Sequence, residues 1–139
     1  MVPYAREAAA ACGIAPDDLR FVTGSVEAAP FADASFDYVI STLVLCSVPS
    51  QAAALHEIKR VLRPGGRFVF IEHVVSPTPG LRKVQEIFDP LQQLVAQCHL
   101  TRDTGRAIHE AGFTDVQLRE ISVEGAAFIA PHIVGLATL

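Results

Sequence analysis

Two apolar segments of the sequence, residues 36–43 and 67–75, carry polar side chains toward their C-terminal ends. Ligands of open α/β sheets bind beyond the carboxyl ends of the strands, so these side chains are candidate binding and catalytic groups. A histidine, whose reference pKa is about 6.5, can accept a proton from a hydroxyl or a thiol at neutral pH. The polar side chains are Ser41 and Thr42 on the first segment, and Glu72 and His73 on the second.

Each candidate also has a purely structural interpretation. His73 can be a partly buried histidine whose hydrogen bonds are satisfied, and residues 41–43 can be ordinary packing at a strand end. His99 and His132 are weaker candidates for chemistry, and Asp89 can simply cap a restarted helix. The sequence leaves both interpretations open.

The three cysteines, Cys12, Cys46 and Cys98, are odd in number and lack the spacing of a metal site. They are typical of reduced thiols in an intracellular protein, so we expect a cytoplasmic location and no bound metal. Cys46 lies just after the first apolar segment, close to where a ligand would bind. Because no activating partner is visible in the sequence, a buried apolar cysteine is the default expectation.

The hydrophobic pattern predicts the elements that position these residues. Residues 36–43 are rich in β-branched and aromatic side chains, as expected of a strand covered on both faces. Ser50 can cap a helix over residues 51–62, which residues 63–66 (RPGG) end. A second apolar strand follows at residues 67–75. Strand, helix and strand with short connections predict a parallel βαβ unit.

The rest of the chain predicts further helices and strands. Pro90 is expected to kink its helix or restart it at Asp89. A shift in the apolar phase between Leu118 and Ile121 predicts a β-bulge. The expected helices are 3–12, 81–96 and 102–111, the last capped by Thr101, and the expected strands are 20–23, 116–123 and 133–139.

Composition and charge predict a single globular domain over residues 1–139. Half of the residues are hydrophobic and 19% are charged, which argues against a disordered chain. A net charge of −4 gives no nucleic-acid footprint, and the cluster Lys59, Arg60, Arg63 and Arg67 is interpreted as a solvated helix end. No signal peptide and no apolar run of about 20 residues is seen, so no membrane span is expected.

Several motifs together closely resemble the class I S-adenosylmethionine-dependent methyltransferases. Residues 60–66 (RVLRPGG) before an apolar strand match a specific local signature of that family, and residues 24–31 (GSVEAAPF) are similar to its adenine-edge segment. The closest resemblance is to the methyltransferase-like 7 type, within a UbiE-like group, whose members methylate small thiols. The motifs that match its pattern in order are LVLCSV (43–48), EHV (72–74), DP (89–90), CHLTR (98–102) and PHI (131–133).

The resemblance implies an α/β fold with a Rossmann-like, mostly parallel sheet that ends in an antiparallel β-hairpin. The first two strands of that fold, with their glycine-rich turn and ribose-binding acid, have no counterpart here. We therefore expect an incomplete, N-terminally truncated methyltransferase sheet. Assigned by order, residues 20–23, 36–42, 67–73, 116–123 and 133–139 would be its third to seventh strands.

The resemblance also implies methyl transfer from S-adenosylmethionine to a small-molecule acceptor, with a thiol as the expected class. Residues carried over as cofactor-binding are Ser25, Val26 and Glu27 along the adenine, and Ser41, Thr42 and Leu43 facing the cofactor. The resemblance implies that Glu72 and His73 are the catalytic residues, facing the acceptor.

The open edge of the apolar stretch 38–45 predicts compensation by a homodimer, by a shifted third strand or by a missing N-terminal half. Three alternatives remain open at this point. They are a truncated piece of an active enzyme, an inactive interaction module that binds no cofactor, and an enzyme that completes its site by pairing two chains.

Overall fold

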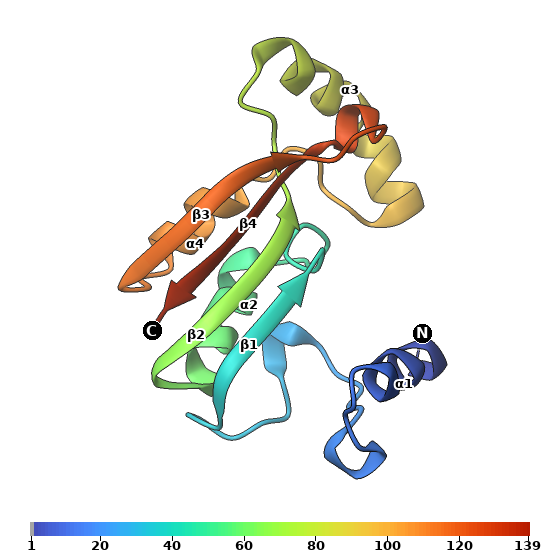
Figure 1. The fold of residues 1–139 in the computed structure, drawn as a ribbon. Coiled ribbons are helices and arrows are strands. Elements are labelled where there is room, and N and C mark those ends of the chain that lie inside the picture. Colours follow the sequence, from blue (N-terminus) through green and yellow to red (C-terminus); the bar gives the residue numbers. More distant parts are fainter. Residues whose placement is uncertain (1) are drawn as a thin grey trace.

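A mixed four-stranded sheet organises the part of the chain that the computed structural model describes, residues 2–139 (Figure 1). Its strand order is β1-β2-β4-β3. The elements are α1 (Val2–Ala11), β1 (Phe36–Thr42), α2 (Gln51–Val61), β2 (Leu62–His73), α3 (Pro79–Ala96), α4 (Thr104–Glu110), β3 (Asp115–Ser122) and β4 (Pro131–Thr138), with short 3-10 helices η1 (Pro16–Asp18), η2 (Val26–Ala28) and η3 (Ala127–Ile129).

The predicted βαβ unit is confirmed, because β1 and β2 pair in parallel and α2 connects them. Ser50 caps α2 as expected: its side chain accepts a hydrogen bond from the backbone N–H of Ala53. The helix ends at Val61, and the following RPGG stretch lies within β2. Gly65 has a φ of 77°, a left-handed conformation that glycine adopts without the steric cost of a Cβ.

The predicted antiparallel hairpin is also confirmed, and its second strand lies in the interior of the sheet. β4 pairs with β3 on one side and with β2 on the other, antiparallel to both. The β3–β4 register runs without a shift, so the bulge expected between Leu118 and Ile121 is wrong. β3 is an edge strand with partly open faces, so apolar side chains on both of them need no bulge. The register shift lies instead in β1, between Phe36 and Tyr38.

Three local expectations are corrected by the structure. Residues 20–23 do not form a strand, because no described strand lies beside them to complete a backbone ladder. Asp103, rather than Thr101, caps α4, since its carboxylate accepts from the backbone N–H of Arg106 at 3.0 Å. α3 continues through Pro90 and is not restarted at Asp89.

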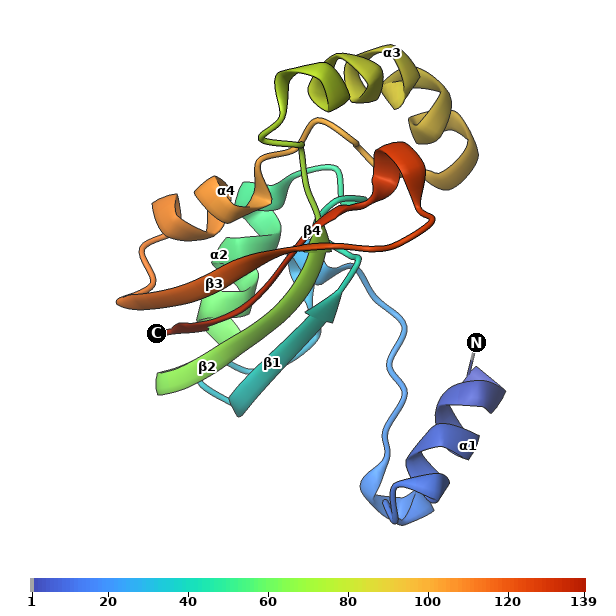
Figure 2. The same cartoon turned by 45° about the horizontal axis from the view of Figure 1, so that its top comes forward.

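The core lies between one face of the sheet and the two helices α2 and α4, which cover it (Figure 2). Phe68 and Phe70 of β2 are fully buried there. The opposite face is not covered, and Tyr38, Ile40 and Ile71 are exposed on it. The expectation that residues 36–43 are covered on both faces is therefore wrong, because α1 stands apart from the sheet in both views.

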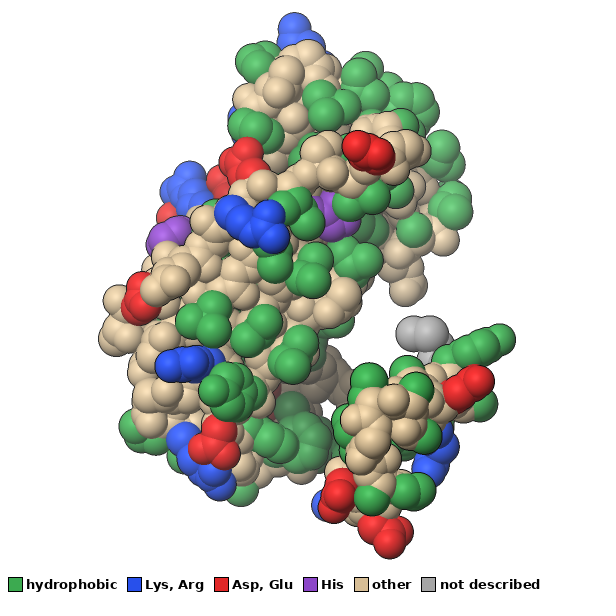
Figure 3. All heavy atoms as spheres, in the orientation of Figure 1, with side chains coloured by type: hydrophobic (Ala, Val, Ile, Leu, Met, Phe, Trp, Pro, Cys, Tyr) green, Lys and Arg blue, Asp and Glu red, His purple; other side chains and the backbone are tan. Residues whose placement is uncertain are grey.

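Hydrophobic side chains are visible on the uncovered sheet face and over α3 in the space-filling view (Figure 3). α3 exposes Ile87, Leu91, Leu94 and Val95. None of the helices in residues 2–139 combines the length and the apolarity that crossing a membrane requires.

Candidate active site

Glu72 organises the turn that leaves β1. Its side chain is fully buried, and its carboxylate accepts hydrogen bonds from the Ser41 hydroxyl at 2.6 Å and from the backbone N–H groups of Val44 and Cys46 at 3.1 and 3.3 Å. Leu43, in the same turn, has a φ of 55°. Glu72 therefore holds the turn after β1 against the end of β2.

These contacts separate the residues expected at this strand end into two groups. Glu72 and Ser41 are buried and bonded to each other, so the geometry favours a positioning role for Glu72 rather than contact with a reacting group. Thr42, the last residue of β1, and Leu43, which follows it, are exposed and accessible to a ligand. The sequence pattern located the strand end, but it could not show that Ser41 turns inward.

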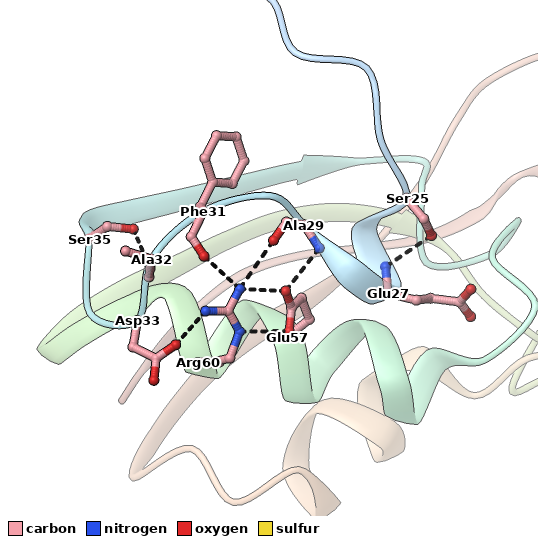
Figure 4. Close-up of polar contacts among 9 residues, drawn as sticks. All are labelled: Ser25, Glu27, Ala29, Phe31, Ala32, Asp33, Ser35, Glu57 and Arg60. Atoms are coloured by element: carbon pink, nitrogen blue, oxygen red, sulfur yellow. Dashed lines mark hydrogen bonds and ion pairs between the residues drawn. The ribbon is translucent and has the colours of Figure 1, made fainter.

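The segment expected to run along an adenine ring lies at the same end of the sheet. Glu27 of η2 accepts a hydrogen bond from the backbone N–H of Ser50, at the start of α2, at 2.6 Å. Ser25 caps η2 by accepting from the backbone N–H of Glu27 at 3.2 Å (Figure 4). Val26 is half-buried between them. The fold thus brings residues 25–27 to the helix that directly follows the turn after β1.

Glu57 and Arg60 of α2 fix the chain that follows η2 (Figure 4). Glu57 accepts a hydrogen bond from the backbone N–H of Ala29 at 2.9 Å and pairs with Arg60 at 2.6 Å. Arg60 also donates to the carbonyl of Phe31 at 2.8 Å and pairs with Asp33. The interpretation of Arg60 as part of a solvated helix end is therefore wrong, because its guanidinium is bound to the backbone and to two carboxylates.

Replacing Glu57 with glutamine should loosen residues 29–33 without unfolding α2. The Arg60 guanidinium lowers the pKa of Glu57, so in wild type this ion pair persists as the pH falls through the usual carboxyl range and is lost only below it. We expect faster hydrogen–deuterium exchange at the Ala29 amide in Glu57→Gln. The matched control is Arg106→Ala, which removes an exposed ion pair on α4. Unchanged exchange at Ala29 would contradict the role given to Glu57.

A cavity of about 240 Å³ opens beyond the carboxyl ends of β1 and β2 and contains four residues singled out from the sequence. It is bounded by the turn after β1, the end of β2, the last turns of α3 and the segment before β4. Its lining residues are Leu43, Cys46, Ser47, His73, Gln92, Ala96, Cys98, Ile129 and His132.

His73 is a buried titratable group of this cavity. Its Nε2 has no hydrogen-bond partner among the described residues, and its Nδ1 lies 4.0 Å from the Cys98 sulfur. Burial, with a smaller contribution from His132, lowers the pKa of His73 to about 4. The two rings meet edge to face, and His132 Nδ1 donates to the Ala130 carbonyl at 3.0 Å. His73 is therefore neutral at neutral pH, and its buried Nε2 has an unsatisfied hydrogen-bonding capacity.

Asp89 and His99 are placed differently from His73. The Asp89 carboxylate accepts from the backbone N–H of Leu100 and from the Gln93 amide, each at 2.5 Å, so it joins α3 to the segment that follows. It does not cap a restarted helix. His99 does not line the cavity, and its backbone N–H donates to the Cys46 carbonyl at 2.9 Å.

Two features of the cavity and its surroundings were not predicted from the sequence. Cys98 lines the cavity beside His73, although its position after a helix gave no sign of this. Gln85 of α3 is fully buried and bonds the Ser76 N–H and the Val74 and Phe128 carbonyls, which anchors α3 above the sheet. Gln85, an uncharged polar residue on the helix face toward the sheet, could have indicated this anchor.

A second cavity, of about 290 Å³, lies between β1, η2 and α2. Its walls are mainly apolar, and the carboxylate of Glu57, which also lines it, is already bonded to Ala29 and Arg60. This cavity therefore provides an apolar surface, but its carboxylate is not free to bind a ligand. Within residues 2–139, no group of three or more His, Cys, Asp or Glu side chains is arranged to hold a metal ion.

Comparison with known proteins agrees with this geometry. Residues 1–70 match the family model described as a methyltransferase domain. The chain belongs to the class I methyltransferase family. That family takes its methyl group from S-adenosylmethionine.

Among curated relatives of this methyltransferase domain, human thiol S-methyltransferase TMT1A is 41% identical over 109 residues, which cover 76% of the chain and 45% of the relative. The ubiquinone/menaquinone biosynthesis C-methyltransferase UbiE of Roseobacter denitrificans is 30% identical over 142 residues, covering 88% and 56%. The chain thus spans about half the length of the curated relatives it matches. The YcgJ protein of Bacillus subtilis shares the fold, with a TM-score of 0.68, 18% identity, and coverage of 99% of this chain and 77% of that one.

The residues present in this methyltransferase domain fit one side of the cofactor. Val26 offers a half-buried apolar surface of the kind an adenine ring packs against, next to the Ser25 hydroxyl. Thr42 and Leu43 are exposed at the carboxyl end of β1, where ligands of open α/β sheets bind. When bound, S-adenosylmethionine supplies a methyl group carried on a positively charged sulfur.

Proposed function

We propose that this domain methylates small thiols in the cavity that contains His73. The observation that carries the proposal is a neutral, buried imidazole whose Nε2 is unpaired among the described residues, in the wall of an open cavity beside Leu43. The 41% identity to a protein named thiol S-methyltransferase supports the thiol as acceptor class.

In this proposal His73 orients the thiol and accepts its proton, and apolar residues of the cavity exclude water. With its proton on Nδ1, His73 accepts a hydrogen bond from the acceptor thiol at Nε2. A free thiol has a pKa of about 8.5, but its S–H becomes far more acidic as the sulfur gives electrons to the methyl carbon. The imidazole then takes the proton despite its low pKa. Leu43, Ala96 and Ile129 keep water from the reacting sulfur.

Methyl transfer is tested with the purified full chain, isotope-labelled S-adenosylmethionine and 2-mercaptoethanol. We expect the methyl thioether, identified by mass spectrometry, and no product from ethylene glycol, which has a hydroxyl in place of the thiol. A folded sample that binds S-adenosylhomocysteine and yields no thioether from any small thiol would overturn the proposal.

His73→Asn should lower the rate of thiol methylation by about 10²–10⁴-fold, because the substrate thiol loses the group that takes its proton. The matched control is His99→Asn, which changes a neighbouring histidine outside the cavity and should retain activity.

Since the folded protein disfavours protonated His73, wild-type stability should decline as the pH falls from about 6.5 toward 4. His73→Asn should weaken that decline in urea melts. If His73→Asn changed stability but methylated thiols at the wild-type rate, His73 would have a structural role only.

We also propose that a second copy of the chain covers the open edge and uncovered face of the sheet at β1. Tyr38 and Ile40 are exposed there, and the outer edge of β1 has no neighbouring strand among the described residues. Exposed apolar edge strands favour pairing with another chain. This arrangement would account for the apolar character of β1.

Ile40→Lys should therefore shift the protein from dimer to monomer, because a charged side chain on an edge strand opposes pairing. Ile87→Lys on α3 is the matched control, since both isoleucines are 73% exposed. Light scattering coupled to size-exclusion chromatography measures the outcome. A wild-type chain that stays monomeric up to high concentration would refute the dimer.

A further inference from the structure

Cys46 and Cys98 meet in the cavity although they are far apart in the sequence. Cys46 belongs to the turn after β1, and Cys98 follows α3. Both line the same cavity. The backbone holds them together, since the N–H of His99 donates to the carbonyl of Cys46 at 2.9 Å.

The pair differs from two cysteines buried in an apolar core. Cys46 is only 2% exposed, but it borders the open cavity, and Cys98 is half-buried beside it. The Cys98 sulfur also lies 4.0 Å from Nδ1 of His73. The two cysteines therefore line one open cavity, and the Cys98 sulfur lies near a polar group there.

We propose that Cys46 and Cys98 form a reactive dithiol that small disulfides oxidise to an intramolecular disulfide. The Cys46 thiolate attacks one sulfur of a disulfide RSSR, forming a Cys46–S–S–R bond and releasing RS⁻. The Cys98 sulfur then attacks the Cys46 sulfur and releases the second RS⁻. The two cysteine protons end on these thiolates, so the dithiol loses two electrons and RSSR is reduced to two RSH.

The surroundings of the two sulfurs fit this order of events. The neighbouring Cys98 thiol lowers the pKa of Cys46 to about 7, against the opposing effects of burial and of Glu72. The same contact and burial raise the pKa of Cys98, although Arg102 opposes this. Cys46 is thus the attacking thiolate near neutral pH, and Cys98 is the resolving thiol.

The disulfide would join the turn held by Glu72 to the segment held by Asp89. It would fix the distance between two walls of the cavity and remove both thiols from its lining. This reactivity goes beyond methyl transfer and does not depend on it, because the exchange needs neither the methyl donor nor His73 as a proton acceptor.

The test uses the full chain carrying Cys12→Ser, which removes the exposed cysteine of the N-terminal segment. Treatment with hydroxyethyl disulfide should lower the intact mass by two hydrogens, and proteolysis should yield a linked peptide containing Cys46 and Cys98. Adding Cys98→Ser should stop the reaction at a mixed disulfide on Cys46.

Two results would overturn the proposal. One is a folded protein, checked by circular dichroism, in which Cys46 and Cys98 both stay reduced while the same reagent modifies Cys12 in the wild-type chain. The other is a wild-type chain that ends with separate mixed disulfides on Cys46 and Cys98. Because the readout is the mass of the protein, a failure of thiol methylation leaves this test unaffected.

Discussion

Gly135→Ala is expected to lower the free energy of unfolding by about 3 kcal/mol, the upper end for forcing extra volume into a packed interior. Gly135 lies in β4 between Phe70 of β2 and Leu118 of β3. A Cβ at this position would lie 2.4 Å from the carbonyl oxygen of Gln117 and 2.7 Å from the Phe70 ring. Neither the backbone of β3 nor a fully buried ring can move aside without opening the sheet.

Urea denaturation followed by circular dichroism measures this effect. Gly80→Ala is the matched control, because a Cβ there meets no atom within 4 Å and α3 gains a better helix former. That variant should be as stable as wild type or more stable by up to about 1 kcal/mol. A Gly135→Ala chain with wild-type stability would mean that β4 does not pack between β2 and β3 in this register.

Glu72→Ala is expected to cost a similar amount, about 3 kcal/mol or more, for a different reason. The carboxylate accepts three hydrogen bonds, and its removal leaves the Ser41 hydroxyl and two backbone N–H groups buried without an acceptor. Each unsatisfied buried donor costs about 1–3 kcal/mol. The turn carrying Leu43 and Cys46 should also loosen, so that ligand binding in the cavity weakens along with stability.

Thermal and urea melts of Glu72→Ala and Glu72→Gln distinguish how much of the stability depends on the size of the side chain and how much on its charge. Glutamine keeps the length but turns an N–H₂ group toward N–H donors, so it should rescue stability only in part. Glu124→Ala, an exposed glutamate in the turn after β3, is the control and should change stability by less than about 0.5 kcal/mol. If Glu72→Ala matched that control, the hydrogen-bonded turn would not be a stabilising feature.

Sequence periodicity predicted most of the sheet, because its strands are strongly apolar and its helix has clear end signals. Ser50, the stripe along α2 and the RPGG stretch fixed the βαβ unit to within a few residues. Residues 20–23 were expected to form a strand and do not, because a strand needs a neighbouring strand for its backbone hydrogen bonds. A short run of β-branched and aromatic residues cannot reveal whether that neighbour exists.

The candidate site was predictable in position but not in orientation. The ends of β1 and β2 correctly marked where Glu72, His73 and Leu43 come together. Whether a side chain points into the cavity or into the core depends on tertiary contacts, and Glu72 and Ser41 point toward each other. The approach of Cys98 to Cys46 depends on how α3 returns to the sheet, which local pattern does not encode.

The interior position of β4 has a consequence for synthesis on the ribosome. β2 is made early, yet its second neighbour consists of residues 131–138, which follow every other element of the sheet. Until those residues emerge, one side of β2 keeps unpaired backbone groups, and α4 has only part of its packing surface. Because contacts between distant parts of a chain form slowly, docking of the completed β3–β4 hairpin on β2 is expected to limit the folding rate. Chaperones that shield exposed strands would then act on this domain mainly during the interval between the synthesis of β2 and that of β4.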